Sequence, residues 1–167
     1  AACPNIILID GSDLAPYREA NARWVAALRH WASEQKPAVM LKLEKVGLDE
    51  VFLDASHIIA ERIRRREFRW EFDGKTFGHE EDDFLRQFLM VGSQVAQELR
   101  SRIMKECRLT TCGGIGTSKL TAKLAVNMNK PNDQTVLFQS AARAYIASLP
   151  IRRIPGFGYG YRSEEHT

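Results

Sequence analysis

VGLDEVFLD, at residues 46–54, places two neighbouring carboxylates in front of an apolar run. The apolar residues Val51, Phe52 and Leu53 predict a buried strand. Such a strand does not ordinarily begin with two acids, because burying an unpaired carboxylate is costly unless a partner or a metal neutralises it. Asp49 and Glu50 therefore either lie in water at a turn or hold a cation.

The segment before the two acids is predicted to be a partner strand. Residues 38–44 alternate, with Val39, Leu41 and Leu43 on one face, which is the period of a strand. The connection that follows contains Gly47 and is interpreted as a hairpin turn. Neighbouring side chains point to opposite faces of a regular strand but converge at some turns and bulges, so this placement favours a common site for the two acids.

Helical periodicity accounts for much of the remaining chain. The predicted helices cover residues 13–35, 57–66, 80–107, 118–129 and 141–148. Asp13, Ser56 and the pair Thr117-Ser118 are expected to supply N-caps. Four aromatic and aliphatic residues at helical spacing are expected to form the buried stripe of the first helix: Tyr17, Trp24, Leu28 and Trp31.

Further strands are predicted at residues 6–9, 109–115 and 135–138, together with a hairpin at 68–77 around Asp73-Gly74. Strands and helices do not follow the regular βαβ order of a doubly wound fold, because hairpins are interspersed. The chain is therefore assigned to the α+β class, with a mixed or antiparallel sheet and long helices on one face.

Composition indicates one domain of ordinary size. The chain has 167 residues, of which 44% are hydrophobic and 27% charged, as in soluble globular proteins. No apolar run approaches the roughly 20 residues of a membrane span, and no signal peptide is recognisable. Cys3, Cys107 and Cys112 are too few and too scattered for a disulfide framework or a zinc site, which favours the cytosol or nucleus.

The net charge of +3 is unevenly distributed. Residues 1–99 carry 13 Lys and Arg against 17 Asp and Glu, whereas residues 100–162 carry 11 against 2. An acidic half with a carboxylate pair, followed by a basic half, suits a protein that holds a metal ion and a polyanion together. Chance asymmetry of a solvated surface is the alternative.

A glycine-rich stretch, GGIGTSK at residues 113–119, joins a predicted strand to a predicted helix. Glycines let a ligand approach the backbone, a helix N-terminus attracts anions, and Lys119 adds a positive charge. The order of residues is neither that of a Walker A motif nor that of the dinucleotide fingerprint. A tight connection that needs glycine explains the stretch equally well.

Two other basic stretches are candidate phosphate contacts. The turn IPGFG, at residues 154–158, exposes backbone N–H groups beside Arg152 and Arg153. The end of the helix predicted at 57–66 gathers four arginines: Arg62, Arg64, Arg65 and Arg66. A solvated helix end, favoured by the helix dipole, and a phosphate contact explain this second cluster equally well.

Three motifs, in this order, resemble those of the Y-family translesion DNA polymerases. They are the palm signature LDEVFLD at residues 48–54, the block GIGTSKLTAKLA at 114–125 with NKPN at 129–132 and QTV at 134–136, and LPIRRIPGFG at 149–158. The resemblance covers about residues 3–160. Gly47, the VGSQ stretch at 91–94 and Cys3-Pro4 look closest to the iota branch, with eta as near kin.

The resemblance implies template-directed nucleotidyl transfer from a dNTP to a primer 3′-OH by a two-metal mechanism, with Mg²⁺ or Mn²⁺. Asp49 and Glu50 would be the catalytic, metal-binding carboxylates, and Lys119 would meet the triphosphate. The residues implied to bind DNA are Arg152, Arg153, Gly156 and Gly158. The implied partners are primer–template DNA and a dNTP, with a sliding clamp and other replication factors reached through regions outside this chain. The implied location is the nucleus.

The resemblance also divides the chain. Residues 1–148 would be a partial palm without its N-terminal strand and fingers, 149–161 the start of a thumb with a helix-hairpin-helix-like turn, and 162–167 a non-native tail. The family's first metal-binding Asp would lie upstream of Ala1, because Asp10 does not match its motif. The chain is therefore interpreted as an internal fragment that does not polymerise by itself.

Two other functions fit the same residues. A non-catalytic, palm-like module would bind DNA through residues 100–162 independently of Asp49 and Mg²⁺. An unrelated nucleotidyl transferase or cyclase would share the metal-binding acids, but it would lack the Lys119 block and the Pro-Gly turn.

Overall fold

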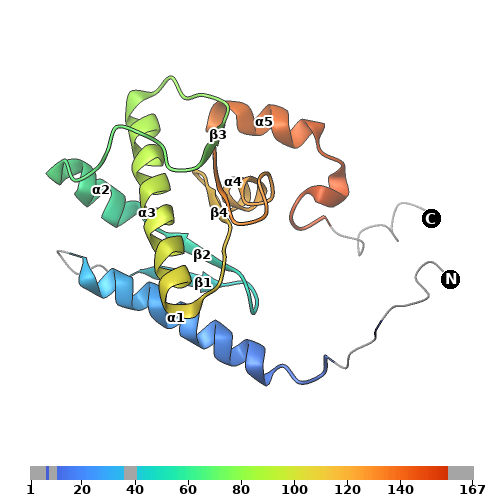
Figure 1. The fold of residues 1–167 in the computed structure, drawn as a ribbon. Coiled ribbons are helices and arrows are strands. Elements are labelled where there is room, and N and C mark those ends of the chain that lie inside the picture. Colours follow the sequence, from blue (N-terminus) through green and yellow to red (C-terminus); the bar gives the residue numbers. More distant parts are fainter. Residues whose placement is uncertain (1–6, 8–10, 36–40, 158–167) are drawn as a thin grey trace, which may run out of the picture.

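The computed structural model describes residues 7, 11–35 and 41–157 (Figure 1). Its helices are α1 (Ala15–Glu34), α2 (Ser56–Arg65), α3 (Asp83–Cys107), α4 (Lys119–Ala125), α5 (Gln139–Ser148) and the 3₁₀ helix η1 (Ile151–Arg153). Its strands are β1 (Lys42–Lys45), β2 (Val51–Asp54), β3 (Lys75–Phe77), β4 (Gly113–Ile115) and β5 (Gln134–Leu137). The predicted α+β class is confirmed.

The strands form two small sheets. β1 and β2 make an antiparallel hairpin in which Lys45 pairs with Val51, so the predicted turn before β2 is confirmed. The second sheet is parallel and has the order β3-β5-β4. Parallel pairing requires long crossovers, and α3 lies in the chain between the two edge strands of this sheet.

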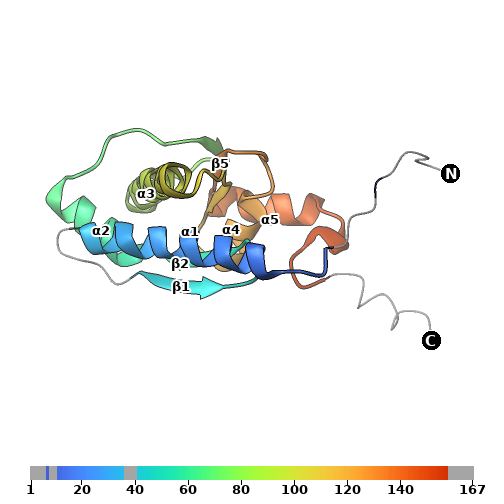
Figure 2. The ribbon, with the colours of Figure 1, turned by 60° about the horizontal axis from the view of Figure 1, so that its bottom comes forward.

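Helix α3 is the centre of the molecule. It packs against α1 and α2 and also contacts β4 and β5; Figure 2 looks nearly along it, with α1 running across the view. Its middle, residues 89–95, is buried on every side. The helix is buried all round at this point because different elements pack on its different sides. Asp82 begins α3 by accepting the Leu85 N–H at 2.8 Å.

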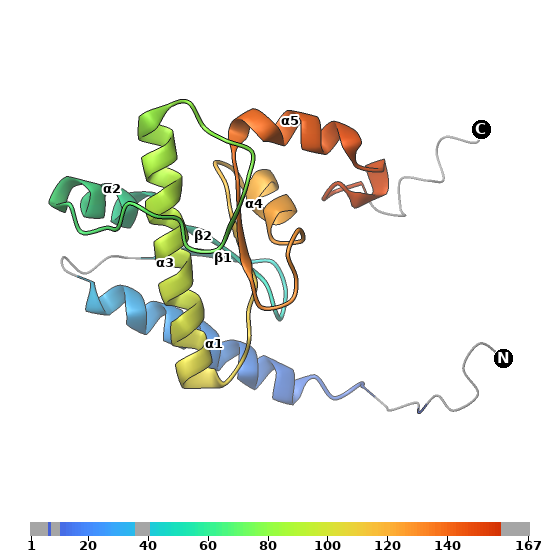
Figure 3. The same cartoon turned by 45° about the horizontal axis from the view of Figure 1, so that its top comes forward.

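The parallel sheet is covered on both faces, by α3 and by α4 (Figure 3). A Cβ added to Gly113 would lie 3.4 Å from the Arg100 Cδ of α3. One added to Gly114 would lie 2.6 Å from the Val126 nitrogen, at the end of α4. Successive strand residues point to opposite faces, so the glycine at 114 is what allows β4 and α4 to touch.

The apolar core has one large and two smaller parts. The large part joins α1, α2 and α3 through buried residues such as Trp24, Leu28 and Val91, and the β1–β2 hairpin packs on it through Leu43 and Leu53. The smaller parts surround β5 and include Leu124 and Leu137 in one, and Leu89 and Val136 in the other. Because α3 contributes Val91 to the large part and Leu89 to a smaller one, it links them.

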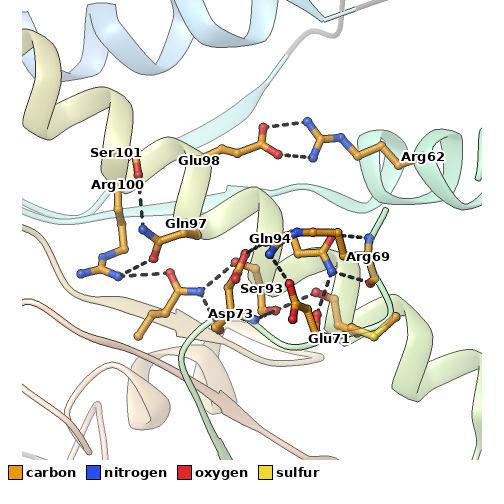
Figure 4. Close-up of polar contacts among 12 residues, drawn as sticks. Arg62, Arg69, Glu71, Asp73, Ser93, Gln94, Gln97, Glu98, Arg100 and Ser101 are labelled. Atoms are coloured by element: carbon orange, nitrogen blue, oxygen red, sulfur yellow. Dashed lines mark hydrogen bonds and ion pairs between the residues drawn. The ribbon is translucent and has the colours of Figure 1, made fainter. Parts of the chain in front are cut away.

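The predicted hairpin around Asp73-Gly74 is wrong. Only residues 75–77 form a strand, and that strand pairs with β5. The preceding segment, residues 68–74, is irregular, and side chains of α3 satisfy its backbone (Figure 4). Gln94 accepts the Arg69 N–H at 3.1 Å and donates to the Arg69 and Glu71 carbonyls at 2.7 and 2.8 Å. Ser93 Oγ accepts the Asp73 N–H at 2.9 Å.

Two predicted helix caps, Asp13 and Ser56, are also wrong, because each helix has its N-cap immediately after a carboxylate that accepts the N–H of the first helical residue. The N-cap of α1 is Leu14, and Asp13 instead accepts the Ala15 N–H at 2.9 Å. The N-cap of α2 is Ala55, and the Asp54 carboxylate accepts the Ser56 N–H at 3.0 Å. The Ser118 cap is confirmed: its hydroxyl accepts the Thr121 N–H at 3.2 Å.

Several predicted elements are longer than the observed ones or are displaced along the chain. The strand expected at 109–115 is confined to β4, the helix expected to reach 129 ends at Ala125, and β5 begins and ends one residue earlier than expected. Tyr17, expected in the buried stripe of α1, is 60% exposed, because the core begins further along that helix. The strand predicted at 6–9 lies outside the described residues except for Ile7, and β1 is described only from Lys42, since residues 36–40 are not described.

Candidate functional site

The turn between β1 and β2 carries the two candidate metal ligands and is fixed to α1. Its backbone closes through the Val46 N–H, which donates to the Glu50 carbonyl at 3.0 Å. The buried Asn21 of α1 donates to the Leu48 carbonyl at 2.6 Å and accepts from Lys45 Nζ at 3.0 Å. A single buried amide therefore holds both sides of the turn.

Asp49 and Glu50 differ in their surroundings. Asp49 is exposed, and its carboxylate makes no ion pair or hydrogen bond with the described residues. Glu50 is half-buried, and its Oε1 forms an ion pair with Lys123 Nζ. The turn thus presents one unpaired carboxylate beside one that is already neutralised by a cation.

Helix α4 supplies the cations that face the hairpin. Lys119 Nζ pairs with Glu44 of β1 and lies 5.8 Å from the centre of the Phe52 ring. Lys123, one turn further along, pairs with Glu50. The Ser118–Thr121 capping box and the glycines of β4 fix the start of this helix. The structure therefore brings together Glu50, Lys119 and Lys123, beside the turn that carries Asp49.

The donor chemistry of the turn suits a hard divalent cation, because Mg²⁺ prefers carboxylate oxygens and commonly uses one or two of them. The described residues contain no group of three or more His, Cys, Asp or Glu side chains in a metal-binding arrangement. Asp49 and Glu50 therefore fit as part of a cation site that needs further oxygen ligands. Substrate phosphates are ligands of that kind.

The basic residues near the end of the described chain form a separate group. Arg152 and Arg153 lie in η1 with exposed side chains. Gly156 follows with a φ of 94°, a backbone conformation that favours glycine, and a Cβ there would meet nothing within 4 Å. Gly158 lies outside the described residues. No ion pair or hydrogen bond joins this group to the β1–β2 turn among the described residues.

Sequence reasoning missed the contributions of Asn21 and Lys123. The spacing of Lys119 and Lys123, four residues apart, puts them on one face of a helix, and that signal could have identified Lys123 as a second cation. No sequence signal connects Asn21 with the turn, because the contact spans 27 residues and depends on how α1 crosses the hairpin.

Residues 1–127 match the model of the impB/mucB/samB family. The chain belongs to this family. Its relatives include the DNA polymerase iota of Mus musculus and of Homo sapiens, each 34% identical over 94% of this chain, and the DNA polymerase eta of Arabidopsis thaliana, 30% identical over 95%. A DNA polymerase IV of Yersinia pestis is 29% identical over 93% of the chain.

These family members are considerably longer than the chain. It spans 22% and 21% of the two iota polymerases, 27% of the eta polymerase and 34% of the bacterial polymerase. The resemblance to Y-family DNA polymerases indicated by the three motifs is confirmed. Among the described residues, no helix is both long and apolar enough to cross a bilayer.

Proposed function

We propose that this chain forms the greater part of the palm of a Y-family DNA polymerase and contributes to translesion DNA synthesis. The reaction proposed for the full-length protein is template-directed transfer of a nucleotide from a dNTP to a primer 3′-OH. The observation that supports this proposal best is the position of the β1–β2 turn, which carries Asp49 and Glu50, against the lysines of α4. Membership of a family that includes DNA polymerases also supports it.

The residues of this site have three proposed roles. Asp49 and Glu50 hold Mg²⁺, or Mn²⁺ in its place, and the bound ion supplies Lewis-acid stabilisation of charge on the phosphoryl group. Lys119 and Lys123 attract the anionic triphosphate and orient it toward the turn. Asn21 is a positioning residue, because its amide keeps the turn on α1.

The exposed arginines and the glycine turn that follow α5 are proposed to hold the DNA backbone. Arg152 and Arg153 supply positive charge, and Gly156 and Gly158 are proposed as further contacts to the DNA backbone at the proposed start of the thumb. The proposal includes primer–template DNA and dNTP as ligands, a sliding clamp as a partner of the full-length protein, and a nuclear location in a eukaryotic cell.

The test is primer extension by a full-length polymerase that contains this chain. Asp49→Ala is expected to lower the rate by about 10⁴-fold, equivalent to ~5.4 kcal/mol of transition-state stabilisation. Glu19→Ala, which removes an exposed acid of α1, is the matched control and is expected to retain the rate. Near-normal extension by Asp49→Ala would refute the metal role.

A non-catalytic DNA-binding module is the second candidate, and the excess of basic residues at 100–162 favours it. Such a module binds DNA in a salt-dependent manner without Mg²⁺. Under this alternative, the full-length protein would fail to extend primers even with Asp49 intact, while Arg152→Ala with Arg153→Ala would still weaken its DNA binding.

A further inference from the structure

A surface pocket of about 430 Å³ lies between the end of α2 and the first turns of α3, away from the residues assigned above. Its lining consists of Ile63, Arg66, Phe68, Trp70 and Gln87. The volume falls within the roughly 300–1,000 Å³ of small-ligand pockets. The lining therefore combines apolar and aromatic side chains with one guanidinium group and one amide group.

Trp70 is the most unusual residue of this pocket, because 79% of its surface is exposed to solvent. The other two tryptophans of the chain, Trp24 and Trp31, are only 9% and 6% exposed. Phe68 contacts the Trp70 ring edge-on, with 5.1 Å between the ring centres, and packs on the large core. An exposed indole with a fixed neighbour is a ready stacking surface.

The backbone next to Trp70 is held in place by α3. Both backbone groups of Arg69 bond to the buried Gln94 side chain, and the Glu71 carbonyl bonds to it as well (Figure 4). The Arg69 side chain is occupied with Glu71 and Asp73. This anchoring places the exposed ring before any ligand arrives, so binding costs little additional ordering of the loop.

The polar groups of the pocket are free to meet a ligand. The side chains of Arg66 and Gln87 make no ion pair or hydrogen bond with the described residues. On the adjacent turn of α2, Arg64 and Arg65 share the single carboxylate of Glu61. Glu67 follows Arg66 and partly offsets the positive charge, but the cationic side chains still exceed the acids at this end of α2.

We propose that this pocket binds single-stranded nucleic acid, with an unpaired base stacked on Trp70, its phosphate on Arg66 and its edge hydrogen-bonded by Gln87. Arginines and aromatic residues interleave in the sequence RRREFRW at residues 64–70. Aromatic stacking beside a cationic backbone contact is how proteins bind single strands without sequence preference. The proposal is independent of polymerase chemistry and uses none of the residues of the β1–β2 turn.

Trp70 makes the test direct, because it is the exposed tryptophan among the three. We expect oligothymidylate to change the tryptophan emission and to protect it from acrylamide quenching. Arg66→Gln should weaken this response and reduce the salt slope of log K by about 0.7, the contribution of one phosphate contact to a single strand. Arg29→Gln, which alters an exposed and unpaired arginine of α1, is the matched control and should change neither.

A second measurement uses the fluorescence anisotropy of labelled oligothymidylate to compare binding by variants of the pocket with binding by a variant of the proposed DNA contact at Arg152 and Arg153. Trp70→Ala should weaken binding by about 5- to 100-fold, whereas Trp70→Phe should retain most of it, because stacking needs an aromatic face. The double variant Arg152→Ala, Arg153→Ala should leave the protection of Trp70 intact, which separates this site from the DNA contact proposed above.

Three outcomes would overturn the proposal. The first is unchanged tryptophan emission at oligothymidylate concentrations that saturate the anisotropy signal. The second is loss of Trp70 protection in the Arg152, Arg153 double variant. The third is protection of Trp70 by an acidic, aromatic peptide but not by oligothymidylate, which would make the pocket a peptide site.

Discussion

At the scale of single residues, two buried side-chain amides, one on α3 and one beside the β1–β2 hairpin, hydrogen-bond to irregular segments as a partner strand does in a sheet. Gln94 is 5% exposed and bonds three backbone groups of the segment before β3. Asn21, also 5% exposed, bonds the Leu48 carbonyl and the Lys45 ammonium group on the two sides of the turn that carries Asp49. Buried polar side chains of this kind are destabilising unless satisfied, and here they determine the path of two irregular segments.

Replacement of Gln94 by leucine should therefore destabilise the protein markedly. Gln94→Leu keeps the apolar volume but leaves the Arg69 N–H and two carbonyls without their partner, at an expected cost of roughly 2–4 kcal/mol. Urea unfolding measures this difference. Gln97→Leu, one turn along α3 and bonded only to side chains, is the control and should cost less than about 1 kcal/mol. Equal effects of the two changes would contradict the role of Gln94.

Asp133 predicts a pH dependence of stability. Its carboxylate accepts the Gln134 N–H at 2.7 Å and pairs with Lys75 at 3.1 Å, and these contacts lower the pKa of Asp133. A lowered pKa stabilises the fold above the unfolded value of about 3.9, and the stabilisation is lost as pH falls through the folded value.

Asp133→Asn should consequently reduce the free energy of unfolding at pH 7 by at most about 1 kcal/mol, because the pair is partly exposed. The difference from the unaltered chain should shrink as the pH is lowered below 4, where the native carboxyl is also becoming neutral. Glu19→Gln is the control, since Glu19 has no partner among the described residues. A difference that grows on acidification would refute this assignment.

At the scale of elements, the contact between β4 and α4 depends on the absence of a side chain at Gly114. A Cβ at Gly114 would lie 2.6 Å from the Val126 nitrogen and 2.9 Å from its Cβ. Neither is the far end of a flexible side chain, so the whole helix would have to move. The helix also carries Lys119 and Lys123, and its position relative to the hairpin is therefore linked to this glycine.

Gly114→Ala should thus lower the free energy of unfolding by about 3 kcal/mol, since overpacking forces backbone shifts. Gly47→Ala provides the contrast, because its nearest neighbour is Asp49 Oδ1 at 3.8 Å and the added methyl group has room. That change should remain within about 0.5 kcal/mol of the unaltered protein. Thermal and urea unfolding compare the two, and similar stability would argue against a close contact between β4 and α4.

At the scale of the whole molecule, α3 joins the two sides of the fold. α1, α2 and the β1–β2 hairpin pack on the large core, whereas β5, α4 and α5 enclose the smaller parts. The buried middle of α3 contributes to both sides and carries the polar side chains that hold the segment leading to β3. Such shared burial predicts that the described chain unfolds as one unit.

Two core substitutions test this cooperativity. Leu28→Ala in the large core and Leu137→Ala beside β5 should each cost about 3 kcal/mol. Each should shift the fluorescence transition of Trp24 and Trp31 and the global hydrogen exchange of β5 amides by the same free energy. A change confined to one of these probes would show that the two sides unfold separately.

The sequence by itself determined those elements whose specifying residues are near neighbours along the chain. The alternation before β2, the cap before α4 and the three ordered motifs all depend on residues close together in the chain, and they predicted the hairpin, the start of α4 and the family correctly. The same reasoning failed at Asp73-Gly74, because a turn-forming dipeptide says nothing of Gln94, which lies 20 residues further along.

Tertiary structure alone decided how the candidate site is assembled. The sequence determined that Asp49 and Glu50 lie in one turn and that Lys119 begins a helix. It did not determine that Lys123 faces Glu50, that Asn21 holds the turn, or that Trp70 lines a pocket and remains exposed. These features depend on how α1, α3 and α4 pack, and packing is set by side-chain contacts across long sequence separations that no local pattern records.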